Sequence, residues 1–118
     1  MIEPTPLLEM RLFTVHDGVR EEFHRISHTG TIPLMRRLGI QVLAYGPATN
    51  NDTLYYLLRA FPSEQVRKEQ AQALYASAEW DRDFEHPVMG MIVDYRIAVM
   101  PATDALIGEF ATAQATAS

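Results

Sequence analysis

Hydrophobic positions along the chain show two periodicities, one of two residues and one of about 3.6 residues. Segments dense in Leu, Ile, Val and aromatic residues predict strands, at residues 7–15, 40–45, 53–61 and 91–100. Segments in which apolar residues recur three and four positions apart predict helices, at residues 17–38, 64–75 and 79–85. The two last helical stretches are read as one interrupted helix, so the order is strand, helix, strand, strand, helix, strand.

Residues typical of helix ends and helix breaks lie at the ends of these segments and within them. Asp17 and Ser63 are placed to cap the two helices, because a short polar side chain accepts a hydrogen bond from an unpaired backbone N–H. Gly30 and Pro33 interrupt the first helix, so we expect a kink or short break just before Pro33. Pro87 is expected to end the second helix.

This order predicts one α+β domain with the ferredoxin-like βαββαβ fold, a four-stranded antiparallel sheet with both helices on one face. A chain of 118 residues has room for one core, and we expect the folded domain at residues 7–100. The ends, residues 1–6 and 111–118, have little to bury, since the second is a run of Ala, Thr, Gln and Ser. We therefore expect both ends to be flexible.

Side chains alternate between the two faces of a strand, so each predicted strand divides into two sets. One set is almost entirely apolar and is expected to face the helices: Leu8, Met10, Leu12, Val42, Ala44, Leu54, Tyr56, Leu58, Ala60, Val93, Tyr95, Ile97 and Val99. The other set mixes charged and large apolar side chains: Glu9, Arg11, Phe13, Tyr45, Tyr55, Arg59, Asp94 and Arg96. A solvated face would be more uniformly polar, and the chain offers nothing else to cover this one. We therefore predict a homodimer with the second set at its interface.

Charge and cysteine content remove several classes of function. The net charge of -5 argues against a nucleic-acid or anionic-membrane surface, because both need clustered Lys and Arg. Cysteine is absent, which fits a cytoplasmic location and excludes disulfide frameworks and thiolate chemistry. The first residues lack the pattern of a signal peptide and no apolar run is long enough to span a membrane, so we expect neither element. Nucleotide, zinc and nucleophile-elbow motifs are also missing, and we expect no cofactor and no metal.

Five stretches of the chain resemble the NIPSNAP family, in the order in which that family has them: Leu8–Gly18 (LEMRLFTVHDG), Ile32–Ile40 (IPLMRRLGI), Leu58–Ser63 (LRAFPS), Ser77–Phe84 (SAEWDRDF) and Asp94–Ile97 (DYRI). The chain departs from the family where a His–Leu–Trp run often stands, since it has Leu57-Leu58-Arg59. The resemblance implies a dimeric α/β barrel. Its superfamily also holds cofactor-free monooxygenases, lactone isomerases, aldoxime dehydratases and stress proteins of unclear activity.

The resemblance also implies a pocket between the helices and the apolar face of the sheet. Tyr56 and Tyr95 are the polar-tipped members of that face, and a buried phenol either bonds to a neighbouring group in the core or points into a pocket. Trp80 and Phe84, together with Met10, either wall the same space or simply pack the core. We predict Met10, Trp80 and Phe84 as the ligand-binding residues.

Two further groups carry candidate chemistry. His28 precedes the expected helix break, where a base would reach the pocket mouth, so His28, Tyr56 and Tyr95 are the candidate catalytic residues. His24 and His28 are four residues apart, but a third metal ligand is not evident, and solvent exposure is the usual outcome for such a pair. Glu9 and Arg11 form either an acid–base pair or, as we favour, an ion pair within the dimer.

Together these patterns favour a cytoplasmic homodimer that binds a small, mostly apolar organic molecule, with cofactor-independent proton transfer or rearrangement as its chemistry. The alternative is a protein that binds a ligand or a partner without catalysis. The sequence leaves open which of the two applies, and it does not identify the ligand.

Overall fold

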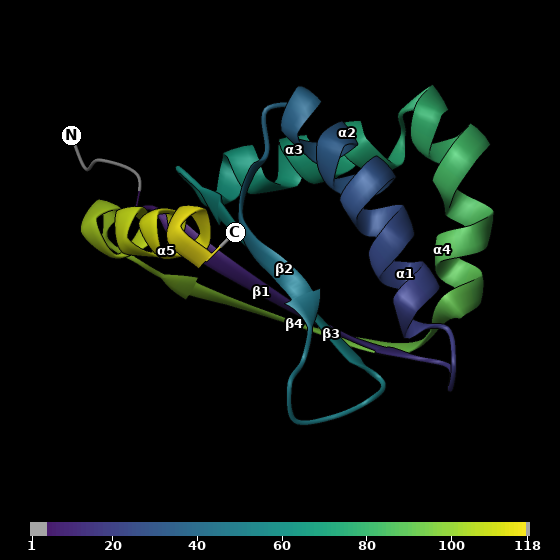
Figure 1. Cartoon of the computed structure of the whole chain (residues 1–118). Coiled ribbons are helices and arrows are strands. Elements are labelled where there is room, and N and C mark those ends of the chain that lie inside the picture. The colour runs from purple at the N-terminus through teal and green to yellow at the C-terminus, as the bar shows by residue number, and fades with distance from the viewer. Residues whose placement is uncertain (1–4, 118) are drawn as a thin grey trace.

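The sheet of the protein has four antiparallel strands in the order β2-β3-β1-β4, as the computed structural model of residues 5–117 shows (Figure 1). The strands are β1 (Leu7–Val15), β2 (Gln41–Pro47), β3 (Leu54–Phe61) and β4 (Ile92–Pro101). β1 and β3 lie in the middle, and β2 and β4 form the edges. This is the expected ferredoxin-like sheet, and the predicted strands are confirmed to within two residues at each end.

The first helical segment is continuous in space but changes its winding in the middle. It consists of α1 (Arg20–Ile26), the π-helical turn η1 (Ser27–Thr31) and α2 (Ile32–Arg37). The expected break before Pro33 is thus a π-helical turn, and the proline occupies the first turn of α2, where a missing N–H is tolerated. Asp17 does not cap α1, because the N-cap is Val19, without a side-chain hydrogen bond.

The second helical segment contains α3 (Glu64–Tyr75), the π-helical turn η2 (Trp80–Phe84) and α4 (Glu85–Met91). Ser63 caps α3 as predicted, since its Oγ accepts a hydrogen bond from the backbone N–H of Val66 at 3.1 Å. The prediction that Pro87 ends this segment is wrong. The proline lies in the first turn of α4, where it can be accommodated, and the helix runs on to β4.

The helices cover the face of the sheet that we had assigned to a dimer partner. Glu9, Arg11, Phe13, Tyr45, Tyr55 and Arg59 all lie on this side, together with the main hydrophobic core. Glu9 and Arg59 are 0% exposed within one chain, so neither can form an intermolecular surface. The prediction for these six residues is wrong because charged side chains can lie in a core face when they neutralise one another, as Glu9 does with Arg11 and Arg59.

The predicted sides hold for the central residues of β4, in contrast to those of the other three strands. Tyr95 and Ile97 lie opposite Phe13 and Arg11, on the helix side, which is the side expected for the two β4 residues. Asp94 and Arg96 lie on the other side of the sheet and are exposed, so these two stay compatible with the predicted interface.

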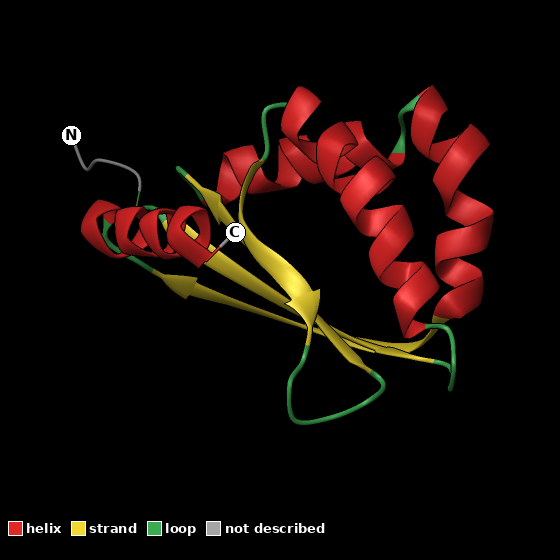
Figure 2. Ribbon diagram, in the orientation of Figure 1, coloured by secondary structure: helices red, strands yellow, loops and turns green. Residues whose placement is uncertain are grey.

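A helix that the sequence did not predict covers part of the opposite face. α5 (Asp104–Ala117) lies across one end of the sheet, on the side away from the other helices (Figure 2). Ile107 and Ala102 are buried there against strand residues including Leu8, Leu43 and Leu58. The folded domain therefore continues beyond Met100, and residues 111–117 are helical, although their composition suggested a flexible tail. Residues 1–4 and 118 of the expected flexible ends lie outside the described residues. No helix in the described part of the chain is long and apolar enough to cross a membrane.

Candidate functional site

A cavity of about 540 Å³ lies between the helical layer and the sheet. Its wall is mostly aromatic and aliphatic, with side chains from β1, β3 and β4 below and from both helical segments above. The polar members of the wall are Arg11, Ser27, Thr31, Tyr55, Tyr75, Asp81, Glu85 and Tyr95. The cavity lies between helices and sheet, as predicted, but its floor is the sheet face that carries Arg11, Phe13 and Tyr55.

Of the three predicted ligand-binding residues, Trp80 alone lines this cavity, and of the three candidate catalytic residues, Tyr95 alone does. Trp80 is buried in its wall, and Tyr95 lines it from β4, where the ring remains 48% exposed. Phe84 is buried in the core next to Gly30 and is not part of the cavity wall.

The remaining candidates lie away from the cavity. Met10 and Tyr56 point to the opposite face of the sheet, because they alternate with Arg11, Tyr55 and Leu57, which line it. His28 is exposed on η1, and its Nδ1 lies 2.6 Å from the hydroxyl of Tyr45. The proposed grouping of His28, Tyr56 and Tyr95 is therefore not formed in this chain, and of the three only Tyr95 reaches the cavity.

The structure instead pairs a cavity tyrosine with a histidine that we had placed on the surface. The Tyr55 hydroxyl lies 2.7 Å from Nδ1 of His24 on α1, and the Tyr55 side chain, 1% exposed, lines the cavity. Burial raises the pKa of the Tyr55 phenol above its ordinary value, so the phenol stays protonated at neutral pH. Burial and the neighbouring His28 both lower the pKa of His24, which favours a neutral imidazole that accepts from the phenol.

The two histidines and two tyrosines form one aromatic cluster. The rings of His24 and His28 are 5.9 Å apart, and the Tyr45 ring lies about 6 Å from each of them. A group of three His, Cys, Asp or Glu side chains that could hold a metal ion is not found among the described residues. The i, i+4 spacing of the histidines was visible in the sequence, but their tyrosine partners on β2 and β3 became visible only in the fold.

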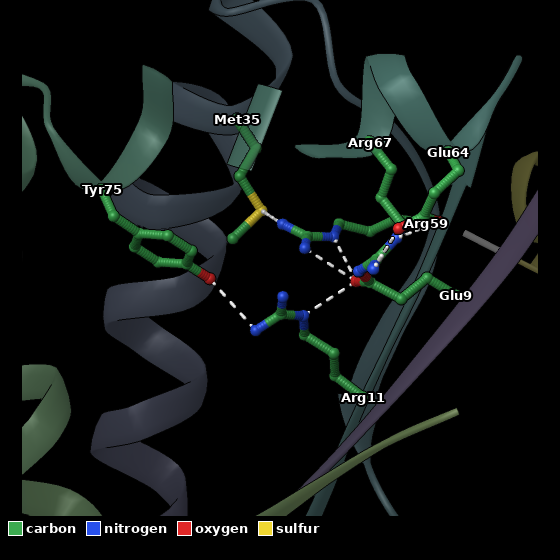
Figure 3. Close-up of polar contacts among 7 residues, drawn as sticks. All are labelled: Glu9, Arg11, Met35, Arg59, Glu64, Arg67 and Tyr75. Carbon is green, nitrogen blue, oxygen red and sulfur yellow. Dashed lines mark hydrogen bonds and ion pairs between the residues drawn. The ribbon is translucent and has the colours of Figure 1, made fainter. Parts of the chain in front are cut away.

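A buried ion cluster adjoins the cavity (Figure 3). The Glu9 carboxylate accepts hydrogen bonds from Arg11 Nε and Arg59 Nε, each at 2.8 Å, and from Arg67 Nη1 at 3.0 Å. Arg67 also binds Glu64, at 2.8 Å and 2.9 Å. Nη2 of Arg59 lies 2.7 Å from Glu9 Oε1 without forming a hydrogen bond, and it is the single buried side-chain N or O atom in the described residues that lacks one.

The charges of the cluster decide the ionisation of Glu9. Burial by itself raises the pKa of a carboxyl group, but the hydrogen bond from Arg11 and the charges of Arg59 and Arg11 outweigh it. The pKa of Glu9 therefore lies below its ordinary value, and the group is a carboxylate at neutral pH. This confirms the ion-pair interpretation of Glu9 and Arg11, although the pair lies inside one chain.

Arg11 connects the ion cluster to the cavity. Its Nη1 donates to the Tyr75 hydroxyl at 3.2 Å, and both side chains line the cavity. The Tyr75 ring meets Trp80 edge to face at 5.0 Å, and the indole N–H of Trp80 donates to Glu85. Hydrogen bonds and one aromatic contact thus connect Arg11 to Glu85 along one wall of an otherwise apolar space.

Solved structures with this architecture include several NIPSNAP proteins. An uncharacterised NIPSNAP-like domain protein from Burkholderia xenovorans superimposes with a TM-score of 0.77 and 14% identity, over 85% of this chain and 87% of that one. A NIPSNAP family protein from Agrobacterium tumefaciens gives 0.76 and 16% identity, over 88% and 91% of the two chains. A cofactor-independent oxygenase from Streptomyces nogalater gives 0.64 and 14% identity, over 85% and 95%.

The protein therefore has the α+β, ferredoxin-like fold shared by NIPSNAP proteins and by cofactor-independent oxygenases. The fold predicted from the order of the elements and the resemblance to NIPSNAP proteins carried by five short motifs are both confirmed by these neighbours. No protein-family model matches the sequence, and a search of curated proteins finds no relative. At these identities the likeness concerns the fold alone and assigns no function to this chain.

Proposed function

We propose that this protein binds a small, mostly apolar organic molecule in the cavity between its helices and its sheet. The observation that carries the proposal is the cavity itself, whose volume of about 540 Å³ is that of a typical small-molecule site. Its apolar wall gives affinity by removing hydrocarbon from water, and a few polar groups at fixed positions give orientation.

Native mass spectrometry of the purified protein tests this proposal, because it reads a bound ligand and the oligomeric mass together. We expect a co-purified molecule that is lost from Val88→Phe, since Val88 is buried in the cavity wall and a larger side chain fills the space. Leu106→Phe on the exposed surface of α5 is the control and keeps the ligand. A cavity-filling variant that still carries the same molecule contradicts the proposed site.

We propose in addition that the protein forms a homodimer through β4. Val93, Tyr95, Ile97 and Val99 are between 39% and 57% exposed. Contiguous apolar side chains of this size are rarely left in water, and β4 is also an edge strand with free backbone groups. A second copy satisfies both requirements, with Asp94 and Arg96 available as complementary charges.

A chemical function is supported by one specific contact, the hydrogen bond between Tyr55 and His24. We propose that this pair moves a proton to and from a carbon acid bound in the cavity. The ligand C–H proton passes to the Tyr55 oxygen while the phenol proton passes to Nδ1 of His24, and the half-buried imidazole exchanges with solvent. The oxygenase from Streptomyces nogalater, which has a similar fold, is an example of a cofactor-independent enzyme with this architecture.

Deuterium incorporation separates this chemistry from simple binding. The protein with its co-purified ligand is incubated in D₂O, and the ligand mass is then measured. We expect a gain in mass with the wild-type protein, which is lost in Tyr55→Phe and in His24→Gln while the ligand remains bound. A ligand that binds without any gain in mass supports the alternative of a non-catalytic binding protein.

A further inference from the structure

The buried ion cluster beside the cavity carries more positive than negative charge. Its three guanidinium groups, those of Arg11, Arg59 and Arg67, face two carboxylates, those of Glu9 and Glu64. No other acidic side chain in the described part of the chain lies within 4 Å of the three arginines. Glu64 pairs with Arg67 at the partly exposed end of the cluster, whereas the buried Arg11 and Arg59 share the single charge of Glu9. One positive charge is therefore left without a counter-ion of its own at the buried end, and an unbalanced buried charge is costly.

Arg11 is the member of the cluster that reaches the cavity. Arg11 is 9% exposed, and its side chain forms part of the cavity wall. Nε is occupied by Glu9 and Nη1 by Tyr75, whereas Nη2 has no hydrogen-bond partner among the described residues, and no dashed line reaches it in Figure 3. The guanidinium group is thus held in place by two bonds and keeps N–H donors for a third partner.

We propose that the ligand of the cavity is an organic monoanion whose carboxylate binds to Arg11, an inference that rests on the proposed ligand-binding function. A guanidinium group is the side chain best matched to a carboxylate, and the bond is strengthened where water is excluded. One surplus positive charge neutralises one negative charge. The cluster therefore favours a carboxylate over a phosphate ester, which carries nearly two charges at neutral pH.

The rest of the wall defines the remainder of the ligand. Ile32, Leu57 and Val88 are buried aliphatic residues of the cavity, and Trp80 adds an aromatic surface. The two acidic residues in the wall, Asp81 and Glu85, are exposed to solvent, in contrast to Arg11. They add repulsion against a second negative charge, so the ligand has an apolar body and a single anionic group.

The proposal is tested with three probes that share one apolar body: 2-naphthoate, the neutral 2-naphthamide and the dianionic 2-naphthyl phosphate. Binding to the full-length protein is measured by isothermal titration calorimetry at pH 7. We expect the carboxylate to bind about tenfold or more tightly than the amide, as a charge-assisted hydrogen bond in a water-poor site does. We expect the phosphate to bind more weakly than the carboxylate.

Variants assign the preference to Arg11. In Arg11→Gln the carboxylate should fall to the affinity of the amide, while the affinity of the amide stays unchanged. Arg82→Gln is the control, because it removes an exposed arginine that pairs with Asp83. This variant should keep the wild-type preference for the carboxylate over the amide. If Arg11→Gln does not fold, Arg11→Lys retains the charge without the planar fork and should keep a smaller preference for the carboxylate.

The outcomes separate this inference from the function on which it rests. An amide that binds as tightly as the carboxylate, a phosphate that binds more tightly, or a preference that survives in Arg11→Gln overturns the monoanion proposal and leaves ligand binding standing. Failure of all three probes to bind overturns the proposed cavity function itself, and the monoanion proposal with it.

Discussion

Glu9 shows, at the scale of a single residue, how one buried charge holds several elements together. Its carboxylate on β1 receives guanidinium groups from β1, from β3 and from α3, so it joins the central strands of the sheet to a helix. Burial of Arg11 and Arg59 without this carboxylate would leave two cations in a region that water hardly reaches. The residue therefore has a structural role, whatever chemistry the cavity performs.

We predict that Glu9→Gln lowers the free energy of unfolding by about 3–5 kcal/mol, because it removes the charge but not the shape of a buried ion-pair partner. Glu64→Gln is the matched control, since Glu64 is exposed and pairs only with Arg67; it should cost at most about 1 kcal/mol. Urea unfolding at pH 7 measures both variants. Equal losses in the two would contradict a special role for the buried carboxylate.

The same residue predicts the response to acid. The pKa of Glu9 is lower in the folded protein than in the unfolded chain, so its contribution to stability is complete above the unfolded value of about 4.3. That contribution is lost as the pH falls through the lower, folded value. We expect wild-type stability to decline more steeply between about pH 5 and pH 3 than the stability of Glu9→Gln, as followed by thermal unfolding across this range.

The two π-helical turns are the feature that shapes the helical layer at the scale of the element. η1 and η2 lie in contact, and Gly30 on η1 leaves room for the ring of Phe84 on η2. A Cβ atom on Gly30 would lie 2.4 Å from a ring carbon of Phe84, and that ring is itself buried. The glycine was visible in the sequence as a helix interruption, but its reason is close packing between two segments distant in the chain.

We predict that Gly30→Ala destabilises the protein by about 1–2 kcal/mol, because the overpacking penalty exceeds the gain in helix propensity. Gly90→Ala is the matched control, since Gly90 also lies in a helix and an added Cβ would meet nothing within 4 Å. That substitution should be neutral or slightly stabilising. Denaturant midpoints of the two variants measure the difference, and a stabilised Gly30→Ala would show that the Phe84 ring yields without cost.

At the scale of the whole molecule, the two faces of the sheet differ in how far this chain covers them. The helix side is closed over β2 and β3 and is open at β4, where Tyr95 and Ile97 line the cavity and remain about half exposed. The other side is covered only in part, by α5. The edge strand β4 is thus exposed on both faces, and the proposed dimer contact lies there.

We predict that Val93→Glu weakens self-association, because it places a charge in the apolar part of the proposed contact, where Val93 is 57% exposed. Ala73→Glu introduces the same charge on the exposed surface of α3 and should leave the assembly unchanged. Sedimentation velocity of both variants beside the wild type reads the outcome. A Val93→Glu protein with wild-type sedimentation would contradict the location of the interface, and a monomeric wild type would contradict the dimer.

The sequence by itself determined the order of the elements, the bounds of β1, β3 and β4 to within one residue, and the cap at Ser63. These features depend on local periodicity and on short-range hydrogen bonds. The sequence also indicated a cavity between helices and sheet. Only the tertiary structure decided which face of the sheet the helices cover. Alternation separates two faces but does not rank them, and the neutralisation of Glu9 by arginines from β1, β3 and α3 depends on contacts up to 58 residues apart. The pairing of Tyr55 with His24, across 31 residues, was decided in the same way and could not be read from spacing along the chain.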